Sequence, residues 1–171
     1  KKTIGLLDAR YVGEPNYMAA TGVAPAYPYA TIDPSYVVGG VFVAAMNRYL
    51  REELKSRSDL PYEALSEPTG QAWDSGTPLG YLYTGDNLRA AMTENEKLKV
   101  FVAAGRYDLV TTATAARYQL NHLGLSPALR GNLTLREYEG GHMMYLVEAE
   151  LAKLKADLAT FYAAAAPAKG K

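Results

Sequence analysis

Two side chains suited to acid–base chemistry follow the two clearest predicted strands of the chain. Asp108 lies four residues beyond Ala104, where one apolar run ends, and His142 lies four residues beyond Tyr138, where another strand-like run ends. A neutral imidazole can take a proton from a nucleophile, and a carboxylate on its other nitrogen fixes the tautomer and stabilises the imidazolium. Asp108 is the candidate for that carboxylate, and His142 is the candidate base.

Each of these residues also has a purely structural interpretation. Asp108 could satisfy backbone N–H groups at the start of the following helix. Gly140, Gly141 and His142 could form an ordinary turn in which the glycines let the chain bend sharply. Their joint position favours chemistry, because ligands of parallel α/β sheets bind outside the carboxyl ends of the strands. The second histidine, His122, falls inside a predicted helix and is interpreted as structural or surface-exposed.

The elements that must position this pair alternate along the second half of the chain. Residues 98–104 form a short apolar run typical of a buried parallel strand. A helix capped by Thr111 or Thr112 follows, then a strand at 133–138, and then an amphipathic helix whose apolar positions span 151–161. The order strand, helix, strand, helix predicts an α/β fold with a parallel sheet and crossover helices.

The first half of the chain is less regular. Residues 11–36 are rich in tyrosine and proline and are predicted to form a loop or lid. A helix is expected to start at Asp33 and to end near Arg57, and residues 58–80 return to turn chemistry. A short apolar run around Ile4 is typical of a further strand for the sheet. Two or three strands are few for a covered parallel sheet of about five or six.

This change of character sets the predicted domain organisation. Residues 1–80 are expected to form a lid-bearing and linker region. Residues 81–171 are expected to form the strand–helix–strand–helix part of an α/β core, opening with a short helix capped by Asp86. Because the sheet is small, the core is predicted to be completed by other polypeptide.

Two motifs resemble a known family. Ala-Gly-Arg-Tyr-Asp at 104–108 and Gly-Gly-His-Met-Met at 140–144 resemble the last two triad elements of serine carboxypeptidases. The wider stretch 73–162 is similar to the bacterial branch of that family, and 1–72 fits the lid-bearing region before it. Acid before base also matches the chain order of α/β-hydrolases. The resemblance implies the C-terminal portion of an α/β-hydrolase, with a mostly parallel sheet, crossover helices and a loop and helix lid segment.

The resemblance implies a function as well. It implies a serine-type carboxypeptidase that removes C-terminal residues from peptides through an acyl-enzyme, with Asp108 and His142 as catalytic residues. Met143 matches the methionine that borders the leaving-group pocket and is therefore expected to contact substrate. Neither a metal nor an organic cofactor is implied, and a secreted or periplasmic location is favoured.

The chain departs from the family pattern in several places. The family commonly has Gly-Asp-x-Asp around the acid, with an asparagine soon after. Here Arg106 replaces the first aspartate, and threonines stand at 111 and 112. Glu139 occupies the first position of the usual Gly-x-Gly-His. The acid and the base themselves are unaffected by these changes.

The nucleophile is the larger departure. No serine of the chain lies in a Gly-x-Ser-x-Gly frame, and Ser75, in Trp-Asp-Ser-Gly, comes closest but follows no buried strand. Ser75 is therefore interpreted as a loop serine. The nucleophilic serine, the oxyanion hole and the carboxylate-binding groups are expected on a complementary N-terminal chain or segment, which would be the partner of this one.

Composition excludes other classes. Acidic and basic residues balance at 18 each without a basic stripe, so nucleic acid is not an expected partner. The absence of cysteine excludes thiolate catalysis and zinc–thiolate sites. No apolar run reaches the ~18 residues of a membrane span, so no membrane partner is expected.

Two alternatives stay open. A different α/β-hydrolase, such as an esterase, acyltransferase or aminopeptidase, would use the same acid and base. A non-catalytic binding module, in which the tyrosine-rich residues 11–36 grip a partner, would need neither.

Overall fold

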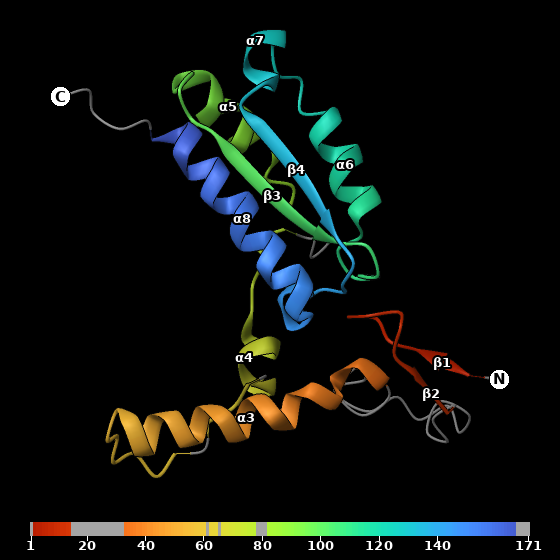
Figure 1. The fold of residues 1–171 in the computed structure, drawn as a ribbon, viewed down its shortest axis with the longest axis vertical. Coiled ribbons are helices and arrows are strands. Elements are labelled where there is room, and N and C mark those ends of the chain that lie inside the picture. Colours follow the sequence, from red (N-terminus) through yellow and green to blue (C-terminus); the bar gives the residue numbers. More distant parts are fainter. Residues whose placement is uncertain (1, 15–32, 61, 65, 78–81, 167–171) are drawn as a thin grey trace. The chain divides into compact units, whose positions relative to one another are not determined.

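The structure, a computed structural model, describes residues 2–14, 33–60, 62–64, 66–77 and 82–166 (Figure 1). The chain divides into two compact units. The first comprises Lys1–Gly5 with Tyr11–Leu82, and the second comprises Leu6–Arg10 with Tyr83–Lys171. A short segment from near the N-terminus therefore belongs to the unit that carries the candidate site. The assignment of residues 1–80 as a lid region stays a prediction.

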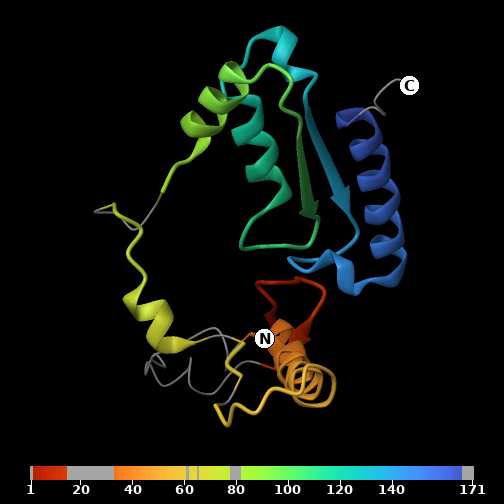
Figure 2. The same ribbon diagram turned by 90° about the vertical axis from the view of Figure 1, so that its left-hand side faces the viewer.

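The second unit is built around a parallel strand pair. Strand β3 (Val100–Gly105) pairs with β4 (Leu133–Tyr138), in a register that runs from Val100 opposite Leu133 to Gly105 opposite Tyr138. Helices α6 (Ala113–Asn121) and α7 (Pro127–Arg130) connect the two strands, and α8 (Glu148–Ala165) follows. Figure 2 shows α6 on one face of the pair and α8 on the other. The predicted α/β order and parallel pairing are confirmed.

Local sequence explains where these helices begin and end. The Thr112 side chain accepts a hydrogen bond of 3.1 Å from the Ala115 N–H, so Thr112 is the cap of α6. Gly124 follows that helix with φ of +70°, a conformation that favours glycine. Helix α5 (Gly85–Glu94) has Thr84 at its N-cap position. The predicted cap, Asp86, lies instead in the first turn, where its charge suits the helix dipole.

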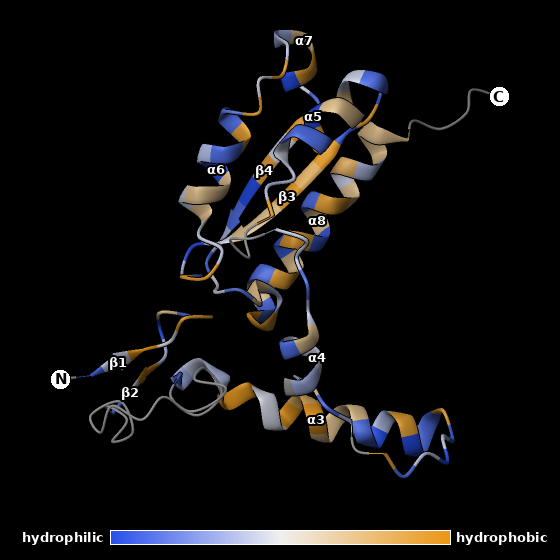
Figure 3. Ribbon diagram, turned by 180° about the vertical axis from the view of Figure 1, so that it is seen from behind, coloured by the Kyte–Doolittle hydropathy of each residue, from blue (hydrophilic) through white to orange (hydrophobic). Residues whose placement is uncertain are grey.

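Strand alternation creates an apolar layer on each side of the pair. One layer is a core of Met92, Leu123, Leu125 and Leu129, against which Leu88, Leu98, Val100, Leu120 and Leu133 pack. On the other side Phe101 contacts Phe161 of α8, with ring centroids 5.4 Å apart, and the buried Tyr138 hydroxyl donates to Asp157 at 2.9 Å. Figure 3 shows that β3 is hydrophobic along most of its length, whereas β4 becomes hydrophilic toward its carboxyl end.

The first unit contains short elements. Strands β1 (Thr3–Ile4) and β2 (Val12–Gly13) pair antiparallel. Where the structure describes this unit, the helical segments that follow are the 3₁₀ helix η1 (Pro34–Val37), α3 (Val38–Arg48), the π-helical η2 (Tyr49–Glu53) and α4 (Glu67–Ala72).

Two predictions for the first unit can be compared with these elements. The strand near Ile4 exists, but it pairs with β2 in a separate sheet, so the expectation that it extends the parallel sheet is wrong. The helical run starts where predicted, because the Asp33 side chain accepts from the Ser35 N–H at 2.8 Å, and it ends at Glu53 rather than near Arg57. Most of the predicted lid, 15–32, lies outside the described residues.

Replacing Met92 tests the core of the second unit. Met92 is 0% exposed at the centre of its cluster, so Met92→Ala should lower the free energy of unfolding by about 2–5 kcal/mol. Urea denaturation followed by circular dichroism measures this change. The control Leu151→Ala, at a position that is 49% exposed on α8, should cost less than about 1 kcal/mol. Equal costs for the two variants would contradict this description of the core.

Candidate active site

The two candidate residues lie on neighbouring loops because β3 and β4 end side by side. Gly105 and Tyr138 are paired at the carboxyl ends of the strands. Backbone hydrogen bonds continue beyond the sheet, from Arg106 N to the Tyr138 carbonyl and from Tyr107 N to the Gly140 carbonyl, both at 3.0 Å. The loops that carry Asp108 and His142 are therefore extensions of one ladder.

Glycines allow these loops to approach each other closely. A Cβ atom at Gly105 would overlap the carbonyl of Gly141, and one at Gly140 would overlap the backbone of Met144. Neither Gly140 nor Gly141 has positive φ. The chain bends at residues 139–141, as the sequence suggested, and glycine is needed there because the backbones approach closely rather than because of a left-handed φ.

Asp108 and His142 are hydrogen-bonded to each other. His142 Nδ1 lies 2.8 Å from Asp108 Oδ2. Asp108 is 3% exposed, whereas the His142 side chain is 44% exposed. Because an ionised carboxylate only accepts hydrogen bonds, the shared proton belongs to Nδ1. In the neutral imidazole the lone pair is then on Nε2, the arrangement that a general base requires.

The Asp108 carboxylate is fully engaged. Its Oδ1 accepts from the N–H groups of Val110 and Thr111, at 2.8 and 2.9 Å, and its Oδ2 accepts from the Thr111 hydroxyl at 2.6 Å. The structural interpretation is thus correct for the turn, but α6 itself is capped by Thr112. Oδ1 orders the loop, and Oδ2 holds both the Thr111 hydroxyl and the imidazole.

These contacts set the charge state of Asp108. Burial by itself raises the pKa of the Asp108 carboxyl. Hydrogen bonds from the side chain and backbone of Thr111, and then from His142, more than offset that effect, so the pKa lies below its ordinary value. Asp108 is accordingly ionised at neutral pH and can stabilise a protonated imidazole.

Thr111 is a site residue that sequence reasoning missed, since it was considered only as a helix cap and as a departure from the family pattern. Its hydroxyl donates to Asp108 and also lies 3.2 Å from His142 Nδ1, so it bridges the pair. A hydroxyl residue three positions after a carboxylate is a common local turn partner and gives no signal of this bridging on its own.

The predicted substrate residue Met143 is half-buried and directly precedes the 3₁₀ helix η3 (Met144–Leu146). A cavity of about 220 Å³ in the second unit lies elsewhere, lined by α6 and by Leu133 and Leu135 of β4 among others. Asp108, His142 and Met143 do not line it. The substrate-binding role of Met143 stays a prediction.

The described serines do not stand at the carboxyl ends of β3 and β4. Among the described residues of the second unit the only serine is Ser126, at the start of α7. In the first unit, Ser75 lies outside helices and strands, with its Oγ 3.4 Å from Thr77 Oγ1, and is a loop serine as predicted. The described residues thus offer His142 no nucleophilic serine within its own unit.

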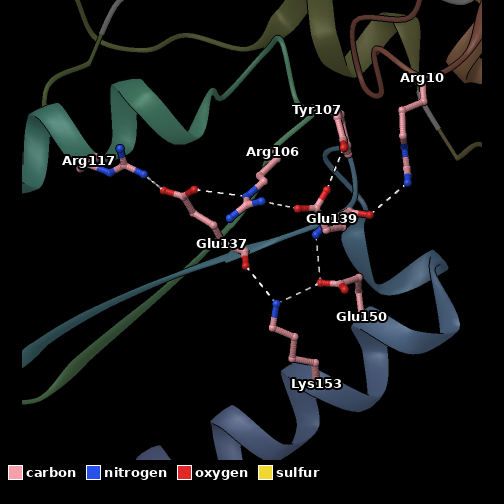
Figure 4. A network of polar contacts seen from close by, with 8 residues as sticks. All are labelled: Arg10, Arg106, Tyr107, Arg117, Glu137, Glu139, Glu150 and Lys153. Carbon is pink, nitrogen blue, oxygen red and sulfur yellow. Dashed lines mark hydrogen bonds and ion pairs between the residues drawn. The ribbon is translucent and has the colours of Figure 1, made fainter.

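Two charged residues that flank the site, Arg106 and Glu139, contact each other. Arg106, after β3, forms an ion pair with Glu139, after β4, and the Tyr107 hydroxyl donates to Glu139 at 2.7 Å (Figure 4). The hydrogen bond from Tyr107 is the largest effect that lowers the pKa of Glu139. The Glu150 side chain accepts from the Glu139 N–H at 2.9 Å. Arg106, Tyr107 and Glu139 therefore link the two loops through their side chains.

Other site types lack support within the described part of the chain. His122 Nδ1 donates a hydrogen bond to the Tyr118 carbonyl at 2.7 Å, and its ring stacks on the Tyr118 ring, which fits its surface assignment. No group of three or more acidic or histidine side chains is placed there to hold a metal ion. None of the described helices combines the length and hydrophobicity needed to span a bilayer.

The lowered pKa of Asp108 predicts how acid acts on stability. The unfolded chain protonates this carboxyl near pH ~3.9, before the folded chain does, so the stability it contributes is present above that pH and is lost as pH falls through the folded pKa. Urea denaturation from pH 7 to pH 2 should show the gap between wild type and Asp108→Asn narrowing below about pH 4. The control Asp86→Asn, in an exposed pair with Arg89, should cost less than about 1 kcal/mol at pH 7. A constant gap would contradict the assignment.

Thr111 can be tested with matched variants. Thr111→Val removes the hydroxyl that donates to Asp108, so it should raise the Asp108 pKa above the wild-type value, whereas Thr111→Ser should leave it nearly unchanged. Titration of the Asp108 side-chain carboxyl by ¹³C NMR measures both. The same pKa in the valine and serine variants would show that the hydroxyl does not contribute.

No family model matches the sequence, and no significant match was found among curated proteins or among solved structures.

Proposed function

We propose that this chain supplies the acid Asp108 and the base His142 of a serine-type carboxypeptidase with an α/β-hydrolase core. The observation that carries the proposal is the 2.8 Å hydrogen bond between a buried carboxylate and a half-exposed imidazole. The two residues stand at adjacent carboxyl ends of parallel strands, where α/β folds bind their ligands. Their order along the chain is that of the α/β-hydrolases.

The chemistry follows from the orientation of the imidazole. His142 Nε2 takes the proton of the serine hydroxyl as the serine oxygen bonds to the scissile carbonyl carbon. The protonated His142, stabilised by Asp108, then gives that proton to the nitrogen of the leaving C-terminal amino acid as the peptide bond breaks. In the second half-reaction His142 takes a proton from water, whose oxygen attacks the acyl carbon, and returns it to the serine.

A complementary segment is part of the proposal. Within the described residues the parallel sheet has only the strands β3 and β4, well below the usual ~5–6. Apolar side chains beside the acid and base are also exposed, among them Leu109, Val110, Tyr145 and Leu146. A partner segment would cover such surface, extend the sheet and bring the serine, the oxyanion hole and the groups that bind the substrate carboxylate.

The choice of a carboxypeptidase among α/β-hydrolases is supported by the motifs at 104–108 and 140–144. The same acid and base could serve an esterase, an acyltransferase or an aminopeptidase. These alternatives differ in groups that the complementary segment would carry, so substrate preference separates them. The binding-module alternative depends on residues 11–36, most of which lie outside the described residues.

The proposal predicts a reactive serine on a second polypeptide segment and a base at His142. Native mass spectrometry of the purified protein, followed by a denaturing run, should detect the segment, and a fluorophosphonate should label its Gly-x-Ser-x-Gly peptide. Assays with N-blocked dipeptides should then show release of the C-terminal residue. His142→Ala should lower kcat/KM at least about 1,000-fold, because triad members act as a unit.

The chain contains its own control, since His122→Ala alters an exposed histidine outside the site and should leave kcat/KM within about twofold. If the protein hydrolyses esters but releases no C-terminal residues, the assignment as a carboxypeptidase is wrong and another α/β-hydrolase is indicated. A chain that is folded, alone and unreactive toward fluorophosphonate would contradict the catalytic proposal.

A further inference from the structure

The segment Leu6–Arg10, called here the clasp, runs across both loops of the candidate site. On the Asp108 side, Leu109 N donates to the Leu6 carbonyl and Ala9 N donates to the Tyr107 carbonyl, each at 2.9 Å. On the other side, the backbone N–H of His142 itself donates to the Leu7 carbonyl at 2.6 Å. The clasp therefore binds the backbone of the two loops at once, although it is distant from both in sequence.

Asp8 anchors the clasp against the His142 loop. Its side chain is 13% exposed and accepts hydrogen bonds from Arg10 N, Nε and Nη2 at 3.0, 2.9 and 2.6 Å. It also accepts from the backbone N–H of Gly141. A Cβ atom at Gly141 would overlap the Leu7 carbonyl and the Asp8 side chain, so the two backbones are in direct contact.

Arg10 connects Asp8 to the two loops. Its Nη1 donates to the Glu139 carbonyl at 3.0 Å (Figure 4), and its guanidinium carbon lies 4.9 Å from the centroid of the Tyr107 ring. The fork-like pairing of Arg10 with Asp8 is directional, so it fixes orientation as well as contributing energy. The rigid fork of arginine, unlike the flexible ammonium of lysine, can satisfy the carboxylate and the Glu139 carbonyl together.

We propose that Asp8 and Arg10 are positioning residues that hold the His142 loop in register with Asp108. The backbone N–H of His142 is hydrogen-bonded to the clasp, while its side chain must stay within hydrogen-bond distance of Asp108. A displacement of about 1 Å in such a site can cost about 100-fold in rate. The positioning role of Asp8 and Arg10 rests on the proposed function of His142 as base. The structural coupling between the clasp and the His142 loop does not depend on that function.

Amide hydrogen exchange by NMR on the full chain tests the coupling. In Asp8→Asn and Arg10→Lys the exchange of the His142 amide should accelerate at least about tenfold, as expected when charge-assisted hydrogen bonds are weakened. The Val100 amide, bonded to the Asn132 carbonyl in the sheet, should keep its wild-type rate. The downfield resonance of the His142 Nδ1 proton should broaden or disappear, a signature that loss of overall stability alone does not give.

Arg48→Lys is the matched control. Arg48, the last residue of α3, pairs with Glu52 of η2, is 78% exposed and belongs to the other unit, so this change should affect neither readout. If the Val100 amide of Asp8→Asn also exchanges faster, that variant is destabilised as a whole. The exchange rate of the His142 amide in the milder variant Arg10→Lys then decides. An unchanged His142 exchange rate and Nδ1 resonance in the folded variant would overturn the proposal.

Activity supplies a second, separable readout. With the complementary segment present, Arg10→Lys should lower kcat about tenfold or more with KM nearly unchanged, because the clasp acts on the base and not on substrate binding. Unchanged kcat in this variant would contradict the positioning role. An inactive wild-type protein would contradict the proposed function instead, and the exchange data would still decide the coupling.

Discussion

The parallel pairing of β3 with β4 is the constraint on which the candidate site depends. Because Gly105 lies opposite Tyr138, both strands end at one edge of the sheet, and their loops leave it together. The hydrogen bonds from Arg106 to Tyr138 and from Tyr107 to Gly140 carry the pairing past the sheet. A slip of one residue would turn every side chain to the opposite face and would separate the acid from the base.

The charges at this edge are stabilised by neighbours that also shape the loops. Burial of Asp108 is unfavourable for its ionised form, and hydrogen bonds from Thr111, His142 and the following backbone offset that cost. The Asp8 carboxylate is stabilised in the same way: hydrogen bonds from Arg10 lower its pKa, and burial raises it by a smaller amount. Both carboxylates thus order backbone while leaving the imidazole half-exposed.

Local sequence patterns predicted the helices and strands of the second unit. They did not predict contacts between residues that lie far apart in the sequence. The apolar run before Asp108 and the strand at 133–138 were recognisable because burial and alternation leave a local signature. The helix cap at Thr112 was one of two alternatives offered by the sequence. The bridging role of Thr111 depends on a histidine on another loop, so no pattern near residue 111 could have revealed it.

The contacts of the clasp are a second case that local sequence patterns could not reveal. Asp8 and Arg10 belong to no recognisable sequence motif. Their partners on the two loops follow them in the sequence only after the long stretch Tyr11–Leu82 of the other unit. The run near Ile4 was recognisable as a strand, but its antiparallel partner β2 could not be chosen from periodicity. The spatial reason for Gly141 likewise appears only when Leu7 and Asp8 are seen against it.

The central claim is that Asp108 holds His142 as a base with its lone pair on Nε2. The most direct test is the tautomer of the neutral imidazole, measured by two-dimensional ¹H–¹⁵N NMR of the ring nitrogens in the wild type and in Asp108→Ala. The proton of His142 should reside on Nδ1, and Asp108→Ala should abolish this preference. A proton on Nε2 in the wild-type chain would show that Asp108 does not hold His142 as a base.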